Sequence, residues 1–317
     1  MSESTVVSQM NKSAHRSRKS VPRVSIGMPV YNGEKYLEQT LTSLLAQSLK
    51  DFELIISDNA STDKTEKICR SYALADSRIQ YHRCEENQGA AWNFNNVVSL
   101  ARCEFFMWAA HDDLWDPEYI ERCAEVLSQH SEVVLCYTAT QEINENGEIG
   151  RQTATNSQLG SPKPYVRFGA SWRYSPHIPV FGLIRTNILK KTRLIGNFSS
   201  SDRVLVGNLA LLGPFYGIED YLFFYRRHQG QSTGAGRHAL IGWYDPQKRG
   251  KISFPHWRLL REHLISVNRT PLSIVELVAC YAGILRWMMR ERWYLLNNLV
   301  LREPSRKRRL EKPNAVR

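Results

Sequence analysis

The sequence lacks a long apolar run, a pair of cysteines at redox or zinc-binding spacing, and an internal repeat. Its longest apolar stretch, 274–289, is interrupted by Glu276 and Arg286, and a membrane-spanning helix needs roughly 18–20 apolar residues. The six cysteines form neither a C-x-x-C pair nor a zinc-finger pattern. We therefore expect buried, reduced thiols in a cytosolic protein. The first residues are polar and basic, without the apolar segment of a secretory signal.

Positive charge is in excess, with a formal net charge of +11, and it gathers near the two ends of the chain. Basic blocks lie at 15–19 and 306–309. Such runs are most often solvated tails, and the alternative is attraction to anionic lipid head groups. No recognition motif accompanies the charge, so we do not expect a nucleic-acid partner. Residues 1–22 are predicted to be a disordered basic arm.

Apolar, β-branched segments alternate with helical patterns in the first half of the chain. Strands are predicted at 24–30, 52–56, 79–82, 105–109 and 133–137. Their order predicts an α/β fold: a doubly wound, mostly parallel sheet with helices on both faces. After residue 150 the alternation of strand and helix patterns is weaker. Irregular regions are expected at 151–180 and 230–256. Between and after them we expect a strand at 181–184, a helix at 204–212, and helices from 257 onward.

Two neighbouring carboxylates, Asp112 and Asp113, follow the apolar run 105–110. In open α/β sheets, ligands bind beyond the carboxyl ends of the strands. Paired carboxylates there suit Mg²⁺ or Mn²⁺, which also share phosphate oxygens. The alternative is an exposed turn, or an N-cap for a helix that starts near Asp116.

Four segments, each after or at the end of a predicted strand, carry a family resemblance. They are Val24-Ser25-Ile26-Gly27-Met28-Pro29-Val30-Tyr31-Asn32, Leu54-Ile55-Ile56-Ser57-Asp58-Asn59-Ala60-Ser61-Thr62-Asp63, Asn87-Gln88-Gly89 with Asn95, and His111-Asp112-Asp113-Leu114-Trp115-Asp116-Pro117. In this order they resemble the nucleotide-binding half of family 2 glycosyltransferases, which have the GT-A fold. The resemblance implies a catalytic domain over 23–235, with a nucleotide-binding half at 23–125 and an acceptor half at 126–235. A helical C-terminal region with a basic tail would follow at 236–317.

The resemblance assigns the nucleotide to the first strand ends. Pro29 and Tyr31 would lie against the nucleobase. Asp58 would accept a hydrogen bond from the imide N–H of uracil or thymine. One position departs from the family pattern, because Asn59 stands where a second acid is common.

The resemblance assigns the metal to the acid pair. Asp113 corresponds to the metal-binding acid of the D-x-D signature, and Asp112 to the acid beside the ribose or the metal. The first position of that signature is His111 here, so one carboxylate is missing. Mg²⁺ or Mn²⁺ is the expected cofactor.

The later half offers a general base. Asp202 precedes the predicted helix 204–212 and resembles the acid at the start of the family's acceptor-side helix. It would take the proton from the acceptor hydroxyl, and the alternative is a helix N-cap. The runner-up base is the pair Glu219 and Asp220.

The segment Tyr225-Arg226-Arg227-His228 resembles the family's Y-R-x-H motif. Arg227 and His228 would contact the diphosphate, and His228 is also a second candidate metal ligand. The alternative is a solvated basic turn.

The predicted function is an inverting glycosyltransferase that uses a UDP- or dTDP-sugar. Its acceptor would be a saccharide or a lipid-linked saccharide, in cell-surface polysaccharide synthesis. We expect a cytoplasmic protein, either free or peripheral at the inner face of the cell membrane. The apolar, Trp- and Arg-containing stretch after 274 is either an interfacial helix or one packed on the catalytic domain. A nucleotidyltransferase would need a longer Gly-rich loop than 31–35 supplies. The remaining alternative is a non-catalytic nucleotide-sugar-binding or membrane-associated scaffold protein.

Overall fold

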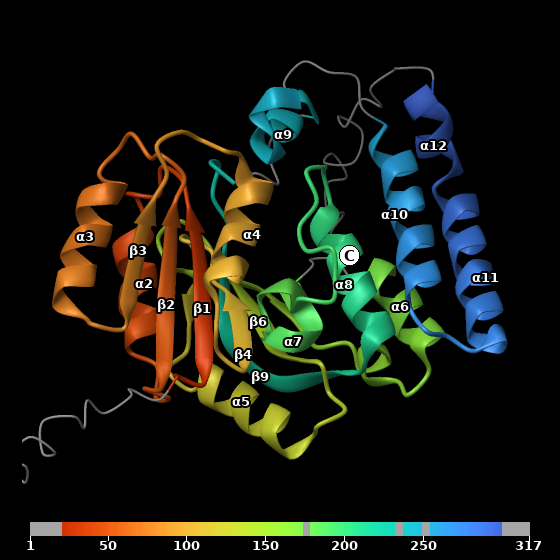
Figure 1. The fold of residues 1–317 in the computed structure, drawn as a ribbon, viewed down its shortest axis with the longest axis horizontal. Coiled ribbons are helices and arrows are strands. Elements are labelled where there is room, and N and C mark those ends of the chain that lie inside the picture. The colour runs from red at the N-terminus through yellow and green to blue at the C-terminus, as the bar shows by residue number, and fades with distance from the viewer. Residues whose placement is uncertain (1–20, 174–177, 232–236, 249–253, 300–317) are drawn as a thin grey trace, which may run out of the picture.

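The computed structural model describes residues 21–173, 178–231, 237–248 and 254–299. Within these residues, nine strands form one sheet (Figure 1). In chain order the strands are β1 (Val24–Val30), β2 (Phe52–Asp58), β3 (Ile79–Arg83), β4 (Phe105–Trp108), β5 (Leu114–Trp115), β6 (Leu135–Ile143), β7 (Ile149–Thr153), β8 (Leu183–Arg185) and β9 (Phe215–Arg226).

The sheet is mostly parallel, as predicted. Its strand order is β3-β2-β1-β4-β8-β6-β9-β5, and β7 pairs with β6 off this path. Neighbours among β3, β2, β1 and β4 are parallel, and so are β6 and β9. Because β8 is antiparallel to both β4 and β6, β6 and β9 run in the same direction as the first four strands. Their carboxyl ends therefore lie on one edge of the sheet, where ligands bind in such folds.

Helices cover both faces of the sheet (Figure 1). In chain order, the α-helices of the described residues are α2 (Leu37–Leu45), α3 (Thr65–Ala75), α4 (Ala90–Leu100), α5 (Tyr119–Gln129), α6 (Pro164–Arg173), α7 (Thr186–Leu189), α8 (Ser201–Leu212), α9 (Arg237–Tyr244), α10 (Pro255–Arg269), α11 (Ile274–Arg290) and α12 (Arg292–Leu299).

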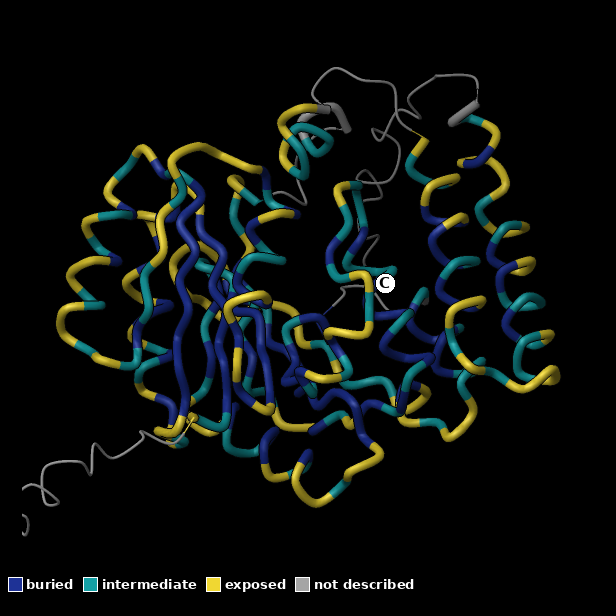
Figure 2. The backbone as a smooth tube through the Cα atoms, in the orientation of Figure 1, coloured by how far each residue is buried: buried dark blue, intermediate teal, exposed yellow. Residues whose placement is uncertain are grey.

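Strand β4 shows why the sheet needs cover on both sides. Met107 packs into a core built with α2, α3 and α5. Its neighbours Phe106 and Trp108 point the other way, into a core built with α4 and α8, because successive side chains of a strand face opposite sides. Figure 2 shows the sheet as the buried centre of the molecule.

A third apolar core joins the C-terminal helices to the rest. Phe168 of α6 and Leu260 of α10 meet Ile284 and Trp287 of α11 there. Helix α11 begins with a capping box between Ser273 and the backbone and side chain of Glu276. The predicted C-terminal helices are thus present. Among the described residues, none of the helices combines the length and apolarity that crossing a bilayer demands.

Two regions predicted to be irregular contain helices. Helix α6 lies inside 151–180 and α9 inside 230–256, and strands β5 and β7 were not predicted either. Burial of Phe168 against α8, α10 and α11 stabilises α6 through tertiary contacts that local pattern does not reveal. The six cysteines are free, as expected, and five of them are buried. The two basic blocks lie outside the described residues.

Candidate functional site

Strand register gathers the predicted site residues at one edge of the sheet. Val30 at the end of β1 lies opposite Asp58 at the end of β2. On the other side of β1, Gly27 lies opposite Trp108 of β4, so the chain after β4 leads to the acid pair on the same edge. Pro29 is buried within β1, whereas the Tyr31 side chain is 42% exposed just beyond it. An exposed ring at this edge is available for stacking against a base.

Asp58 is fully buried, and both of its carboxylate oxygens accept hydrogen bonds. The backbone N–H of Ser61 donates to Oδ1 at 2.8 Å, and the Tyr81 hydroxyl donates to Oδ2 at 2.7 Å. The Arg83 guanidinium lies 3.7 Å from Oδ2. Burial, followed by the bond to Asp58, raises the pKa of Tyr81, which keeps its hydroxyl protonated as a donor. In this structure Asp58 holds the turn that follows β2, and its contact with a nucleobase stays a prediction.

Side-chain amides tie the neighbouring loops to that turn. Asn32 accepts from the backbone N–H of Thr62. Asn59 accepts from the backbone N–H of Gln88 and donates to Asn87. Asn59 therefore acts through its amide, and an acid at this position could not donate to Asn87. The asparagine that departs from the family pattern at position 59 therefore links two loops by hydrogen bonds.

Asp113 has a different environment from Asp58. Its side chain is 1% exposed, and Oδ1 accepts a 2.9 Å hydrogen bond from the backbone N–H of Arg226 at the end of β9. Oδ2 is buried and has no hydrogen-bond partner. Burial and then the nearby charge of Asp112 raise the pKa of Asp113 well above its usual value. A buried carboxylate oxygen without a partner is costly and is suited to contact a ligand.

Asp112 is paired instead with His228. Its Oδ2 lies 2.8 Å from His228 Nε2. The backbone N–H of Gly230 donates to Nδ1 of the same ring, so the ring proton sits on Nε2 and donates to Asp112. Burial alone would raise the pKa of Asp112, but the bond from His228 and the charge of His111 lower it further than burial raises it. His228 therefore orients this carboxylate, and its predicted contacts with metal and diphosphate stay predictions.

Sequence reasoning missed Arg226, which is 1% exposed and organises this corner. Its Nε donates to the backbone oxygen of Asp112, and its Nη2 donates to Gln39, both at 2.8 Å. The guanidinium carbon also lies 4.6 Å from the ring centroid of Tyr36. The sequence places two arginines in a row at the end of a strand. Nothing in the sequence indicates which of the two side chains points into the protein.

Arg227, the predicted diphosphate ligand, lies on the outer side. It forms a 2.9 Å ion pair with Glu142 of β6, and its guanidinium lies over the ring of Tyr225. The side chain is 46% exposed, so it is accessible to a ligand. Its contact with a diphosphate remains a prediction.

The acid pair suits an ion that also binds phosphate. In the described part of the chain, no group of three or more His, Cys, Asp or Glu side chains is arranged to hold a metal. Mg²⁺ typically takes one or two carboxylates and completes its shell with water and substrate phosphates. Asp112 and the unpartnered Oδ2 of Asp113 match that donor set, so the residues present fit such an ion when a diphosphate is also bound.

Asp202 lies in the first turn of α8, outside the strand-end cluster. The N-cap of this helix is Ser200, with a left-handed backbone and no side-chain capping bond, so Asp202 does not cap α8. It lies close enough to Tyr244 of α9 for its charge, after burial, to raise the pKa of that tyrosine. Within the described residues, no hydrogen bond joins Asp202 to the acid pair.

The runner-up base is placed away from the acid pair. Asp220 forms a 2.7 Å ion pair with Arg122 of α5, and Glu219 bonds to Thr155. Five residues of β9 lie between Asp220 and Arg226, and the six steps at ~3.3 Å per residue span about 20 Å along the strand. The pair Glu219 and Asp220 therefore lies in the middle of β9, away from its carboxyl end.

Buried, mostly parallel strands that bring two acids to their carboxyl edge define a GT-A-type nucleotide-sugar fold. The glycosyl transferase family 2 model matches residues 25–193, slightly more than half of the chain. The chain therefore belongs to that family, which confirms the predicted family and fold. The matched segment includes Asp58, Asp112 and Asp113, whereas Asp202 and His228 lie beyond it.

Relatives agree with this membership, and a solved structure shares the fold. An uncharacterized glycosyltransferase of Rickettsia typhi is 39% identical over 108 residues, which are 34% of this chain and 33% of the relative. Glycosyltransferase GlyG of Streptococcus pneumoniae is 26% identical over 215 residues, 65% of this chain and 71% of the relative. The crystal structure of S. aureus TarS 1–349 with UDP-GlcNAc has a TM-score of 0.65 at 18% identity, covering 87% of this chain and 79% of that one. The chain thus spans only about a third of the Rickettsia relative.

Proposed function

We propose that this chain is an inverting glycosyltransferase that transfers a sugar from a UDP- or dTDP-sugar to a saccharide or lipid-linked saccharide. The observation that carries the proposal is the buried Asp113, whose Oδ2 has no partner, beside an Asp112 oriented by His228. This pair lies at the strand edge where the fold binds ligands. Family membership and the UDP-GlcNAc bound to the similarly folded TarS support the donor class.

In this proposal the base and the diphosphate bind to different residues at the carboxyl edge of the sheet. Tyr31, exposed beyond β1, would stack against the base, and Pro29 and Asp58 would shape the floor beneath it. Asp112 and Asp113 would hold Mg²⁺ or Mn²⁺ together with the diphosphate. Bound there, the ion supplies positive charge beside the departing diphosphate. Arg227, which follows β9, would add hydrogen-bond donors to the same oxygens. His228 would join it by turning its Nε2–H from Asp112 to the diphosphate.

Asp202 would supply the base for direct displacement. It accepts the proton of the acceptor hydroxyl while that oxygen forms a bond to the anomeric carbon. The bond from this carbon to the diphosphate breaks at the same time, and the nucleoside diphosphate leaves. Attack from the face opposite the leaving group inverts the anomeric configuration. The position of Asp202 in the first turn of α8, near Tyr244 of α9, supports this role.

Turnover of a panel of sugar nucleotides tests the proposal. We would incubate the full chain with Mn²⁺ and UDP-, dTDP- and GDP-sugars, and measure release of nucleoside diphosphate. We expect one uridine or thymidine donor to be turned over, and Asp202→Asn to lower this rate by about 10²–10⁴-fold. Asp220→Asn is the matched control, because Asp220 lies in the middle of β9, where it is paired with Arg122, and it should retain the wild-type rate.

Two results would overturn the proposal. Loss of turnover in Asp220→Asn as large as in Asp202→Asn would remove Asp202 as the base. Saturable binding of a sugar nucleotide without any release of diphosphate, in the presence of candidate saccharide acceptors, would favour the non-catalytic binding protein instead. The anomeric configuration of the product, read by NMR, decides between inversion and retention.

A further inference from the structure

Helices α11 and α12 both present apolar side chains to solvent. Val275, Val278, Leu285 and Met289 lie on α11, and Trp293 and Leu296 continue the row on α12. Within α11 the spacing of three, seven and four residues places its four members on one side of the helix, and all six residues are more than half exposed. Figure 1 shows these two helices at the end of the molecule opposite α3. We call these six residues the outer face.

The fold itself does not use the outer face. The opposite side of α11 is buried through Cys280, Ile284 and Trp287, which pack in the third core. An ordinary surface helix has one apolar side and one polar side, whereas α11 is apolar on both. A contiguous exposed apolar surface of this kind marks an interaction site.

Charge around the outer face has predominantly one sign. Arg286, Arg290 and Arg292 are exposed beside it. The sequence that follows α12, residues 300–317, contains seven basic and two acidic residues. Apolar side chains, an exposed tryptophan and adjacent arginines are the composition of a helix that lies in a membrane interface, and a polybasic segment next to it is attracted by anionic lipid.

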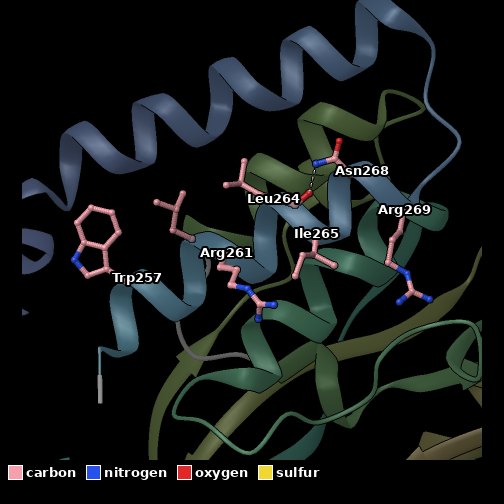
Figure 3. Close-up of a pocket in the computed structure, with 7 residues that line it drawn as sticks. Trp257, Arg261, Leu264, Ile265, Asn268 and Arg269 are labelled. Carbon is pink, nitrogen blue, oxygen red and sulfur yellow. Dashed lines mark hydrogen bonds between the residues drawn. The ribbon is translucent and has the colours of Figure 1, made fainter. Parts of the chain in front are cut away.

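A groove of about 480 Å³ adds apolar surface next to this region. It runs along α10 and is lined by Leu260, Leu264 and Ile265 with Arg261 and Arg269 (Figure 3). It contains none of the predicted site residues. The indole N–H of Trp257, at one end of the groove, donates to the backbone oxygen of Leu295 in α12. One end of the groove therefore reaches α12.

We infer that the outer face docks on an anionic lipid surface, with α11 and α12 lying in the head-group region. A second copy of the chain fits less well, because the flanking arginines and the basic segments after α12 would repel one another. This inference deepens the proposed function, and only its link to a lipid-linked acceptor rests on that function. Docking would hold the catalytic domain beside acceptors embedded in the same membrane.

Vesicle flotation of the full chain, without sugar nucleotide, tests the docking. We would compare vesicles of phosphatidylcholine alone with vesicles that also contain phosphatidylglycerol. The double variant Val278→Glu with Leu285→Glu places two charges on the outer face. The matched control is Leu74→Glu with Ile149→Glu, which alters two apolar side chains that are also exposed but lie on α3 and β7.

We expect the wild type and the control to float with the anionic vesicles, and the outer-face variant to bind at least about tenfold more weakly. Raising the salt from about 0.1 M to about 1 M shortens the screening length from about 10 Å to about 3 Å and should release much of the bound protein. Equal flotation of the outer-face variant and the wild type would overturn the inference, as would equal binding to neutral vesicles.

Light scattering on the same samples distinguishes docking on lipid from association with a second copy of the chain. A wild type that is dimeric in solution, with an outer-face variant that is monomeric and vesicle binding absent from both, would assign the outer face to self-association and overturn the inference. Turnover of the sugar nucleotide in vesicle-free buffer is measured on the same variants. Retained turnover with lost flotation would separate failure of docking from failure of the proposed function.

Discussion

Asp58 and Asp113 are both buried acids at the carboxyl edge of the same sheet, but their surroundings differ. Both oxygens of Asp58 accept hydrogen bonds from the chain itself. One oxygen of Asp113 accepts from Arg226, and the other has no partner. A buried acid whose bonds are complete stabilises the fold, whereas a buried acid left incomplete weakens it. The comparison indicates that the end of β2 is built for structure and the end of β4 for a ligand.

The largest expected effect is on activity at Asp113. We expect Asp113→Asn to lower donor turnover by about 10²–10³-fold, because charge stabilisation of the leaving group is lost. Mn²⁺ should raise the melting temperature of the wild type in the presence of UDP, since ligands that bind the folded state stabilise it, and should have little effect on the variant. If Asp113→Asn turned over the donor at the wild-type rate, Asp113 would not be a ligand-binding acid, and the distinction from Asp58 would be lost.

The next effect is on stability at Asp58. We expect Asp58→Ala to lower the free energy of unfolding by about 1–3 kcal/mol, because the Ser61 N–H and the Tyr81 hydroxyl lose their acceptor. Tyr81→Phe removes one of these bonds and should cost only about 1 kcal/mol. Urea unfolding followed by circular dichroism measures both. If Asp58→Ala were as stable as the wild type, Asp58 would not be a structural acid.

The smallest effect concerns the pH dependence of stability without metal. The pKa of Asp113 is raised by burial and by Asp112, so the folded chain binds this proton more tightly than the unfolded chain does. The wild type therefore loses stability as pH rises from the unfolded pKa, about 3.9, through the raised folded value. Asp113→Asn carries no such proton, so its stability relative to the wild type should increase over this interval.

Urea unfolding at about pH 4, 6 and 8, in the presence of a chelator, measures this difference. Asp58→Asn is the control, because the same change of side chain removes a carboxylate whose two oxygens are both bonded. A constant difference between wild type and Asp113→Asn across the pH range would show that the Asp113 carboxyl does not titrate differently in the folded chain.

Much of the first half of the fold could be predicted because local sequence and burial agree there. Apolar, β-branched runs such as 52–58 form strands in a sheet that is covered on both sides. The turn residues after each run gave the positions of Asp58 and the acid pair. Helices α6 and α9 were missed because Gly, Pro and Ser in those regions indicate loops. Packing partners distant in the chain stabilise these helices, through Phe168 for α6 and Tyr244 for α9.

By itself, the sequence determined the family, the α/β order of elements and the candidate acids, because strand periodicity and strand-end motifs are local properties. Only the tertiary structure decided that Asp58 is fully bonded and Asp113 is not, that Arg226 rather than Arg227 turns inward, and that Asp220 is paired with Arg122 away from the acid pair. These outcomes depend on which strands become neighbours and in which register. Hydrogen-bond partners 23 and 113 residues apart in the chain are chosen by that register, which no local pattern contains.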